Sequence, residues 1–190
     1  MRKSVKQQLA LRVLSTAALM AMVSSIATAA FADTYDLTKG SVDILAEGGK
    51  QYITQWEDKD NDTCVKDGEG KEIRDREDSD ITLTTKDETT GKTETTSNTV
   101  TIDAKEDNTA NVTLENVDIE QPDSHWSGNT DPAPIEIKGD GNTKLELNGN
   151  NTVLSGNGKH AGIEKADVNG TGTLTIKDDV NDDGTAKTGT

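Results

Sequence analysis

Short runs in which apolar and polar residues alternate recur through the second half of the chain, between turns rich in Gly, Asn and Asp. The runs are Val112–Ile119, Ile135–Ile137, Leu145–Leu147 and Leu174–Ile176. Alternation with a period of two is typical of strands that bury one face. The turns leave no space for a helix of ordinary length. The pattern therefore predicts an all-β protein.

Leucines recur in these runs at the spacing of a structural repeat. Leu114, Leu145 and Leu174 lie about 30 residues apart, within the range of solenoid repeats. After residue 32 the aromatic residues are Tyr35, Tyr52, Trp56 and Trp126. So few aromatic rings fit a narrow interior filled by Val, Ile, Leu and Ala, as in stacked strands. We therefore expect a solenoid of stacked strands over residues 33–177.

The first 32 residues have the pattern of a secretory signal peptide. A basic start (Arg2, Lys3, Lys6, Arg12) precedes the apolar or small residues 13–26, and Ala30-Phe31-Ala32 supplies a cleavage site. The alternative is a membrane anchor, but the apolar run is short for a span of about 20 residues. We expect cleavage after residue 32, a secreted or cell-surface location, and no membrane span.

The chain is strongly acidic, with a formal net charge of −15. Loss of the four basic residues of the leader takes this from −15 to about −19. Nucleic acids and anionic membranes are polyanions, so the charge disfavours both as partners and favours cations such as Ca²⁺. Cys64 is the one cysteine, so no internal disulfide is possible, and its acidic surroundings disfavour a reactive thiolate.

Three segments interrupt the strand pattern. Residues 57–80 are mostly charged and predict an acidic, poorly ordered insertion. Residues 121–134 hold three prolines, which cannot donate in a ladder, and predict a surface loop. Residues 178–190 form a polar tail with no closing cap. Because the last coil of a solenoid needs protection, we expect a chain truncated at its C-terminus, either a monomer or part of a longer protein.

Several segments resemble a known family. They are Tyr35–Ile44, Asn111–Ile119, Leu145–Gly156, Ala161–Glu164 and Gly172–Ile176. They are similar to the right-handed parallel β-helix modules of secreted gut and soil Firmicutes proteins, which are carbohydrate-binding domains of pectate-lyase-like fold. The likeness covers 33–56 and 98–177. It implies a short right-handed parallel β-helix that binds polysaccharide or serves as an adhesin, often with Ca²⁺, and it carries no catalytic residues over to this chain.

Candidate ligand-binding residues lie in the proline-flanked loop. An exposed Trp126 would offer a flat apolar platform to a sugar ring, and its ring N–H could donate to a hydroxyl. Asn129 and Asp131 could bond further hydroxyls. The alternative is that Trp126 pins its loop onto the body of the domain. Trp56 offers the same choice.

A calcium-loop spacing occurs in the acidic insertion. Asp58, Asp60 and Asp62 alternate, and Glu69 stands at the twelfth place, as in loops whose hard oxygens converge on Ca²⁺. Thr63 occupies the position that favours Gly, and no amphipathic helix flanks the loop. The alternatives are opportunistic Ca²⁺ binding and a solvated acidic turn.

The function expected is a secreted, non-enzymatic module that binds a polysaccharide or a host glycan. The alternatives are a cell-surface adhesin or structural spacer that recognises protein, and a Ca²⁺-dependent polysaccharide lyase. A lyase needs an Arg or Lys base beside acidic Ca²⁺ ligands. Beyond residue 32 the arginines are Arg74 and Arg76, both in the acidic insertion, which disfavours the lyase. The remaining candidate bases are lysines that adjoin strands, Lys138, Lys144, Lys165 and Lys177. The alternative for these lysines is a solubilising role that also protects sheet edges.

Overall fold

A computed structural model of the chain describes residues 33–122, 132–156, 159–166 and 170–178. These residues belong to one compact unit, Ala32–Thr190. They form β-strands and one short 3-10 helix, η1 (Leu37–Lys39), and contain no α-helix. Within these ranges no helix has the length and apolar character that a membrane span requires. The expectation of an all-β protein is confirmed.

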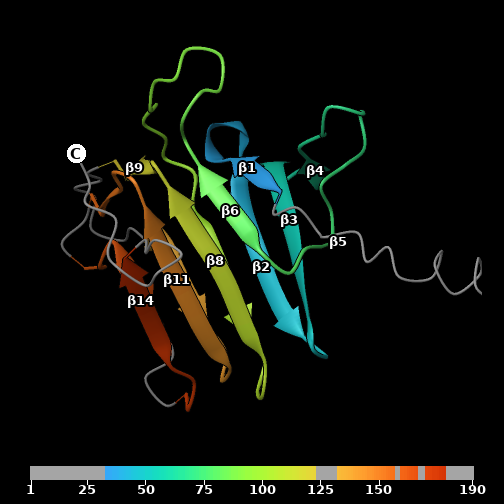
Figure 1. The fold of residues 1–190 in the computed structure, drawn as a ribbon, viewed down its shortest axis with the longest axis vertical. Coiled ribbons are helices and arrows are strands. Elements are labelled where there is room, and N and C mark those ends of the chain that lie inside the picture. Colours follow the sequence, from blue (N-terminus) through green and yellow to red (C-terminus); the bar gives the residue numbers. More distant parts are fainter. Residues whose placement is uncertain (1–32, 123–131, 157–158, 167–169, 179–190) are drawn as a thin grey trace, which may run out of the picture. The chain divides into compact units, whose positions relative to one another are not determined.

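The strands form three sheets (Figure 1). In the first sheet the order is β1 (Thr34–Asp36), β6 (Ile81–Thr84), β8 (Thr109–Glu115), β11 (Asn142–Asn148) and β14 (Leu174–Asp178), all parallel. In the second the order is β13 (Ile163–Lys165), β10 (Ile135–Lys138), β7 (Val100–Ala104), β2 (Ser41–Glu47), β3 (Lys50–Asp58) and β4 (Thr63–Cys64), with β5 (Arg76–Glu77) also paired to β3. In the third, β9 (Asp118–Glu120) pairs with β12 (Thr152–Leu154) in parallel.

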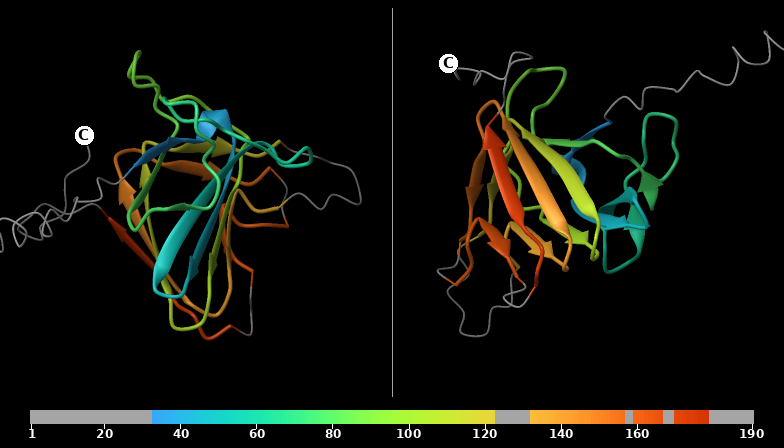
Figure 2. Two further views of the ribbon diagram at one scale, coloured as in Figure 1. Left: turned by 90° about the vertical axis from the view of Figure 1, so that its right-hand side faces the viewer. Right: turned by 60° about the horizontal axis from the view of Figure 1, so that its bottom comes forward.

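The chain runs through these sheets in a recurring order, second sheet, then first, then third. Residues 100–120 supply β7, β8 and β9, residues 135–154 supply β10, β11 and β12, and residues 163–178 supply β13 and β14. Residues 41–96 begin the series with β2 and β6, and Thr96 bridges to Ile119 in parallel. We call each of these four stretches a pass and number them in chain order, so that residues 41–96 are the first pass and residues 163–178 the fourth. Figure 2 shows β8, β11 and β14 side by side in that order, with the blue N-terminal strands on the side of β8 that faces away from β14.

Within each sheet, side chains from successive passes lie in register and form ladders that face the interior. In the second sheet Val42, Val100, Ile135 and Ile163 lie in register. Burial alternates along the strands, so that in β8 every second residue is buried. Alternation puts one face of each strand into a common interior, which the apolar side chains of all the sheets fill. The alternation in the sequence therefore gives the inward face of strands such as β8 and β10 correctly.

The register differs from the one suggested by Leu114, Leu145 and Leu174, because these leucines do not share a ladder. Leu114 lies beside Leu147, Leu145 beside Val112 and Ile176, and Leu174 beside Thr143. A shift of two residues leaves the same side chains facing inward, so alternation alone does not determine the register.

Close turns join the second sheet to the first. Gly139 adopts φ +80°, and a Cβ there would lie 2.2 Å from the Ala104 carbonyl oxygen of the preceding pass. Gly141 donates its N–H to the same oxygen at 2.8 Å. A side chain at Gly139 would push the stacked turns apart, so the turn requires glycine for both its φ and its packing.

The N-terminal passes carry an antiparallel addition. β2 and β3 form a hairpin over the Gly48-Gly49 turn, and β4 and β5 pair with β3. Residues 57–80, expected as a poorly ordered insertion, thus contain two short antiparallel strands, β4 and β5, joined by turns and by the antiparallel bridge of Lys66 to Glu72. Val65 and Ile73 lie in the hydrophobic core at 7% and 6% exposure. Two apolar residues in an otherwise charged segment are enough to anchor it, because both reach the same buried cluster.

Glutamines on β3 complete the N-terminal end of the core. Gln51 and Gln55 are buried on either side of Ile53. Gln51 accepts the N–H of Asn111 at 2.7 Å and donates to the Asn111 carbonyl at 3.0 Å. Gln55 donates to the Asp36 carbonyl at 2.7 Å. These amides satisfy backbone groups of the first sheet from a strand of the second, so they join the two sheets.

Candidate functional site

The expected sugar-binding residues Trp126, Asn129 and Asp131 lie outside the described residues. The described ends of the 121–134 loop are held by hydrogen bonds. The Gln121 N–H donates to the Leu154 carbonyl at 3.0 Å, and the Val100 N–H donates to the Pro134 carbonyl at 2.9 Å. The loop therefore begins directly after β9 of the third sheet and ends directly before β10 of the second.

The four residues with calcium-loop spacing are not brought together as a ligand set. Asp58 accepts hydrogen bonds from the Asn61 backbone (3.1 Å) and side chain (2.7 Å), which lower its pKa. Asp62 forms an ion pair with Arg74 at 2.8 Å. Across 33–122, 132–156, 159–166 and 170–178, no group of three or more Asp, Glu, His or Cys side chains is arranged to hold a metal ion. Asp58, Asp60 and Asp62 lie at the exposed connection between β3 and β4, and Glu69 lies in a separate exposed turn after β4.

Trp56 lies on β3 with its indole already engaged. Its ring N–H donates to Asp43 at 2.8 Å. The Arg74 guanidinium lies 5.1 Å and the Lys59 ammonium 5.9 Å from the ring centre, within cation–π range. The ring holds the insertion against β2, which is the structural alternative considered for a tryptophan in this chain.

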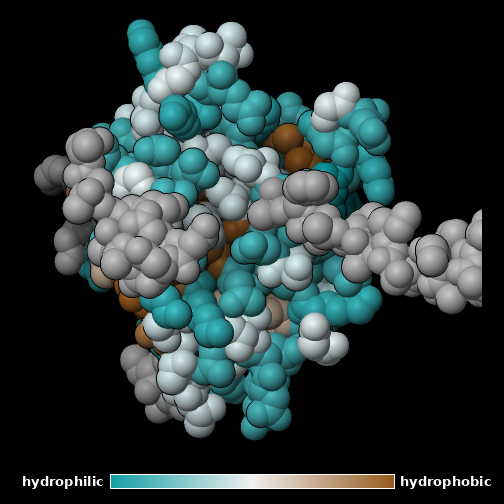
Figure 3. All heavy atoms as spheres, in the orientation of Figure 1, coloured by the Kyte–Doolittle hydropathy of each residue, from teal (hydrophilic) through white to brown (hydrophobic). Residues whose placement is uncertain are grey.

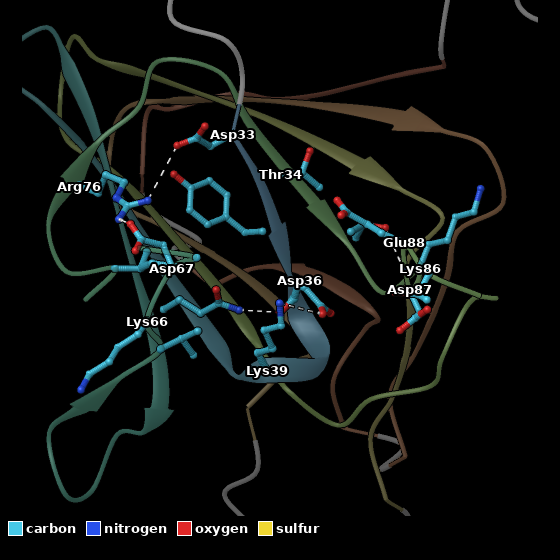
Figure 4. A pocket seen from close by; sticks show the side chains of 17 residues that line it. Asp33, Thr34, Asp36, Lys39, Lys66, Asp67, Arg76, Lys86, Asp87 and Glu88 are labelled. Atoms are coloured by element: carbon cyan, nitrogen blue, oxygen red, sulfur yellow. Dashed lines mark hydrogen bonds and ion pairs between the residues drawn. The ribbon is translucent and has the colours of Figure 1, made fainter. Parts of the chain in front are cut away.

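A cavity of about 460 Å³ lies between β1, the acidic insertion and the loop after β6. Figure 4 shows Asp33, Asp67 and Arg76 on one side and Lys86, Asp87 and Glu88 on the other. Some of its charged groups are paired with one another, Lys39 with Asp36 and Arg76 with two carboxylates. Lys66, Lys86 and Glu88 are exposed and form no ion pair among the described residues. Arg76 forms ion pairs with Asp67 and, at 3.9 Å, with Asp33.

Tyr35 is the one aromatic side chain that lines this cavity. Its phenol donates to Asp78 at 3.0 Å, and burial, together with the negative charge of Asp78, raises its pKa well above the ordinary value. A phenol with a raised pKa stays protonated and donates a hydrogen bond; it does not act as a base. The Tyr35 phenol is thus a donor already engaged by Asp78, and it offers no base to the cavity.

Both arginines considered as lyase bases are committed to acidic partners. Arg74 bonds Asp62 at 2.8 Å and Glu72 at 3.5 Å. Arg76 is held by Asp67 and Asp33 as described. An arginine in such pairs is fixed as a cation, and here the pairs stabilise the fold of the insertion.

A shallow groove crosses the outward face of the first sheet. One part, of about 290 Å³, is lined by β8, β11 and β14 together with Ser79 and Asp80. A second part, of about 320 Å³, continues past Ser79 and Asn111 to the β2–β3 turn. Figure 3 shows this face of the molecule as largely hydrophilic. The groove is open and its lining mixes polar and apolar surface, unlike the closed and mostly apolar pocket of a typical small-molecule site.

The strand register decides which side chains meet on the groove floor. Lys144 lies between Asn111 and Thr175, and Glu146 lies between Thr113 and Lys177. Lys144, Glu146 and Lys177 are exposed, and within the described parts of the chain none of the three forms an ion pair or a side-chain hydrogen bond. Two ammonium groups and one carboxylate therefore remain available, beside hydroxyl and amide groups, on neighbouring strands.

The outward face of the second sheet differs because most of its charged side chains are paired. Asp43 accepts from Trp56 and Lys59, Glu136 pairs with Lys138 at 2.8 Å, and the Glu164 carboxylate lies 2.8 Å from His160 Nδ1. Two sheets with similar outward composition thus differ in the groups that they leave free for a ligand.

Comparison with models of protein families, with curated proteins and with solved structures found no match to this chain.

Sequence reasoning missed the groove and the inward glutamines. The groove depends on which strands pair, and Ser79 and Asp80 reach it from a segment that the sequence analysis assigned to the insertion. A signal for the glutamines was present, since Gln51, Ile53 and Gln55 follow the period of two that places all three on one face.

Proposed function

We propose that this protein is a secreted, non-enzymatic polysaccharide-binding module built as a short right-handed parallel β-helix. The recurring order of the passes, their parallel pairing and the repeated glycine turns support the solenoid. Crossovers between parallel strands of one sheet are right-handed in nearly all proteins, which supports the hand. The apolar leader supports export.

The observation that carries the binding function is the groove over the first sheet. Its floor presents Lys144, Glu146 and Lys177 without partners among the described residues, next to Asn111 and Thr113. Parallel strands about 4.8 Å apart repeat these groups at regular intervals. An extended glycan offers hydroxyls at regular intervals along its length, and charged or amide side chains form strong hydrogen bonds with hydroxyls.

The groove favours a neutral glycan over a strongly acidic one. The charges that line its 290 Å³ part are those of Asp80, Lys144, Glu146 and Lys177, which sum to zero. The whole chain carries −15 and would repel a polyanion. Trp126, Asn129 and Asp131 remain candidate contacts from their loop.

Retention on insoluble glycans tests the proposal. The purified protein is applied to cellulose, xylan, mannan and pectate, with CaCl₂ or with EDTA, and the bound fraction is measured. We expect retention on a neutral glycan. Retention on none of these, nor on an array of host glycans, would remove the function.

Paired substitutions assign the binding to the groove. Lys144→Ala and Glu146→Ala should each weaken binding at least about tenfold, because each removes charge-assisted hydrogen bonds. Lys138→Ala is the matched control, since Lys138 lies on the outward face of the second sheet and is paired with Glu136. Equal losses in all three variants would contradict a site on the first sheet.

A further inference from the structure

Three residues connect the second sheet to the first beside the groove. Residues 78–80 follow β5, which pairs with β3, and precede β6, which pairs with β1 and β8. They belong to no strand, so sheet pairing does not fix their conformation. Ser79 and Asp80 are exposed and line the groove, and Ser79 lines both of its parts. The conformation of this link therefore decides the shape of the groove where the two parts meet.

Asp78 is the residue that fixes this link. It is 6% exposed, and each of its polar groups is bonded. Its backbone N–H donates to the Gln51 carbonyl at 3.0 Å, and its own carbonyl accepts from the Gln51 side chain at 3.2 Å. Its carboxylate accepts the Asp80 N–H at 3.0 Å and the Tyr35 phenol at 3.0 Å. The bond from the Asp80 N–H closes an Asx turn, which sets the direction of the chain at Ser79.

Tyr35 reaches the Asp78 carboxylate from β1. It is 2% exposed and lies in register with Leu83 of β6. Because burial and the charge of Asp78 raise the pKa of the phenol, its hydroxyl stays protonated and remains a donor. A buried carboxylate is costly unless its oxygens accept hydrogen bonds. Without the phenol, one Asp78 oxygen would lose its partner, and rotation of the carboxylate towards water would break the Asx turn.

We propose that Tyr35 is a positioning residue of the glycan-binding groove: its phenol holds the Asp78 carboxylate, and the carboxylate holds the Ser79–Asp80 segment. This inference rests on the proposed function. Tyr35 lines neither part of the groove, so it acts without touching the ligand. Among the residues that the structure describes, the Ser79 hydroxyl and the Asp80 carboxylate have no hydrogen-bond or ion-pair partner, so both can bind glycan hydroxyls.

Tyr35→Phe tests the proposal, because it removes the hydroxyl and keeps the ring. The probe is the hexasaccharide of the neutral glycan that retains the unmodified protein (cellohexaose, xylohexaose or mannohexaose), titrated by calorimetry. We expect the affinity to fall about fivefold or more, as for the loss of a hydrogen-bonded contact. Tyr52→Phe is the matched control. Tyr52 is a partly exposed residue of β3 that lines neither part of the groove, so this variant should bind as the unmodified protein does.

A double-mutant cycle separates positioning from a general loss of structure. If Tyr35 acts through the Ser79–Asp80 segment, Tyr35→Phe should cost less affinity in a protein that already carries Asp80→Ala. Combined with Glu146→Ala, which removes a groove residue of β11, it should keep its full cost. The same cost in both backgrounds would overturn the proposal.

Hydrogen exchange measured without glycan gives a second readout. Peptides that cover residues 78–80 should exchange about fivefold faster in Tyr35→Phe than in Tyr52→Phe, while peptides from β8 and β11 should be unchanged. No change at residues 78–80, or faster exchange throughout the chain, would contradict a local role for the phenol. An unchanged hexasaccharide affinity in Tyr35→Phe would overturn this inference alone. Failure of the unmodified protein to bind any glycan would remove the proposed function, and this inference with it.

Discussion

At the scale of single residues, amide side chains replace backbone partners where strands end. Asn116 lies between β8 and β9 with φ 52°, and its side-chain oxygen accepts the Asn150 N–H of the next pass at 3.3 Å. Asn151 accepts the Val117 N–H at 2.9 Å. Asparagine suits such a corner because it tolerates the left-handed region and carries its own acceptor.

Asn116→Ala should destabilise the protein by about 1–2 kcal/mol. The change adds strain at a positive φ and removes a hydrogen bond between passes. Asn116→Gly is the matched variant, because it relieves the strain and loses the hydrogen bond alone, so its cost should be smaller. Urea unfolding of the three proteins measures the difference. Equal losses would show that backbone strain has no part in the effect.

Asp67 makes the stability of the acidic insertion depend on pH. Its carboxylate accepts the Lys71 and Glu69 N–H groups and bonds Arg76, and these contacts, led by that of Lys71, lower its pKa from 3.8. A carboxyl group with a lowered pKa stabilises the folded state above its unfolded pKa, and this contribution is lost as the pH falls through the folded value.

Asp67→Asn should therefore lower the thermal midpoint at pH 7, and the difference from the unmodified protein should shrink as the pH falls below 3.8. Asparagine keeps the shape of the side chain and removes the charge. Thermal unfolding at pH 7 and at successive acidic values measures the effect. A difference that is constant over this range would contradict a role for the charge.

At the scale of elements, β3 joins two sheets through its inward glutamines. Gln51 is 4% exposed and makes two hydrogen bonds with the backbone of Asn111 on β8 and a third, at 3.2 Å, with the Asp78 carbonyl. Burial of a polar side chain is costly unless its donors and acceptors form hydrogen bonds. Here the backbone groups of Asn111 and Asp78 supply those bonds.

Gln51→Leu should cost about 2–4 kcal/mol, because it leaves a buried N–H and two carbonyl groups without their partner. Gln121→Leu is the matched control. Gln121 bonds the Ser97 carbonyl at 2.7 Å in an exposed setting, so its loss should cost about 1 kcal/mol or less. Denaturant unfolding compares the two. Similar small losses would show that the β3 amides do not hold the sheets together.

At the scale of the whole molecule, the passes differ in how fully they are enclosed. The core residues of β7 and β8 are at most 2% exposed, whereas Ile163 and Leu174 are partly buried. Stability in stacked repeats is close to a sum of terms between neighbours, so a pass with one neighbour is held less strongly than a pass with two.

Hydrogen exchange should follow this order. Amides of β13 and β14 should exchange well before those of β7 and β8, because local opening of the last described strands breaks few apolar contacts. Mass spectrometry of peptides from each pass measures the order. Uniform exchange across the passes would show that the domain opens as one cooperative unit.

The insertion illustrates what sequence reasoning left out at this scale. Its charge predicts solvation, and Val65 and Ile73 are separated by a turn in which the N–H of Gly70 bonds the Asp67 carbonyl. Their burial follows from the pairing of β4 and β5 with β3, which brings both side chains to the core. No pattern among the residues next to them in the sequence indicates that burial.

The sequence by itself determined that the protein is all-β, which side chains face inward on the alternating strands, and where tight turns lie between them, because alternation and turn chemistry act over a few residues. The tertiary structure decided the register of the ladders, the folding of residues 57–80 against β3, and the groove over the first sheet. These depend on which distant segments lie side by side. A shift of two residues, or a different neighbouring strand, keeps every local pattern and changes every contact.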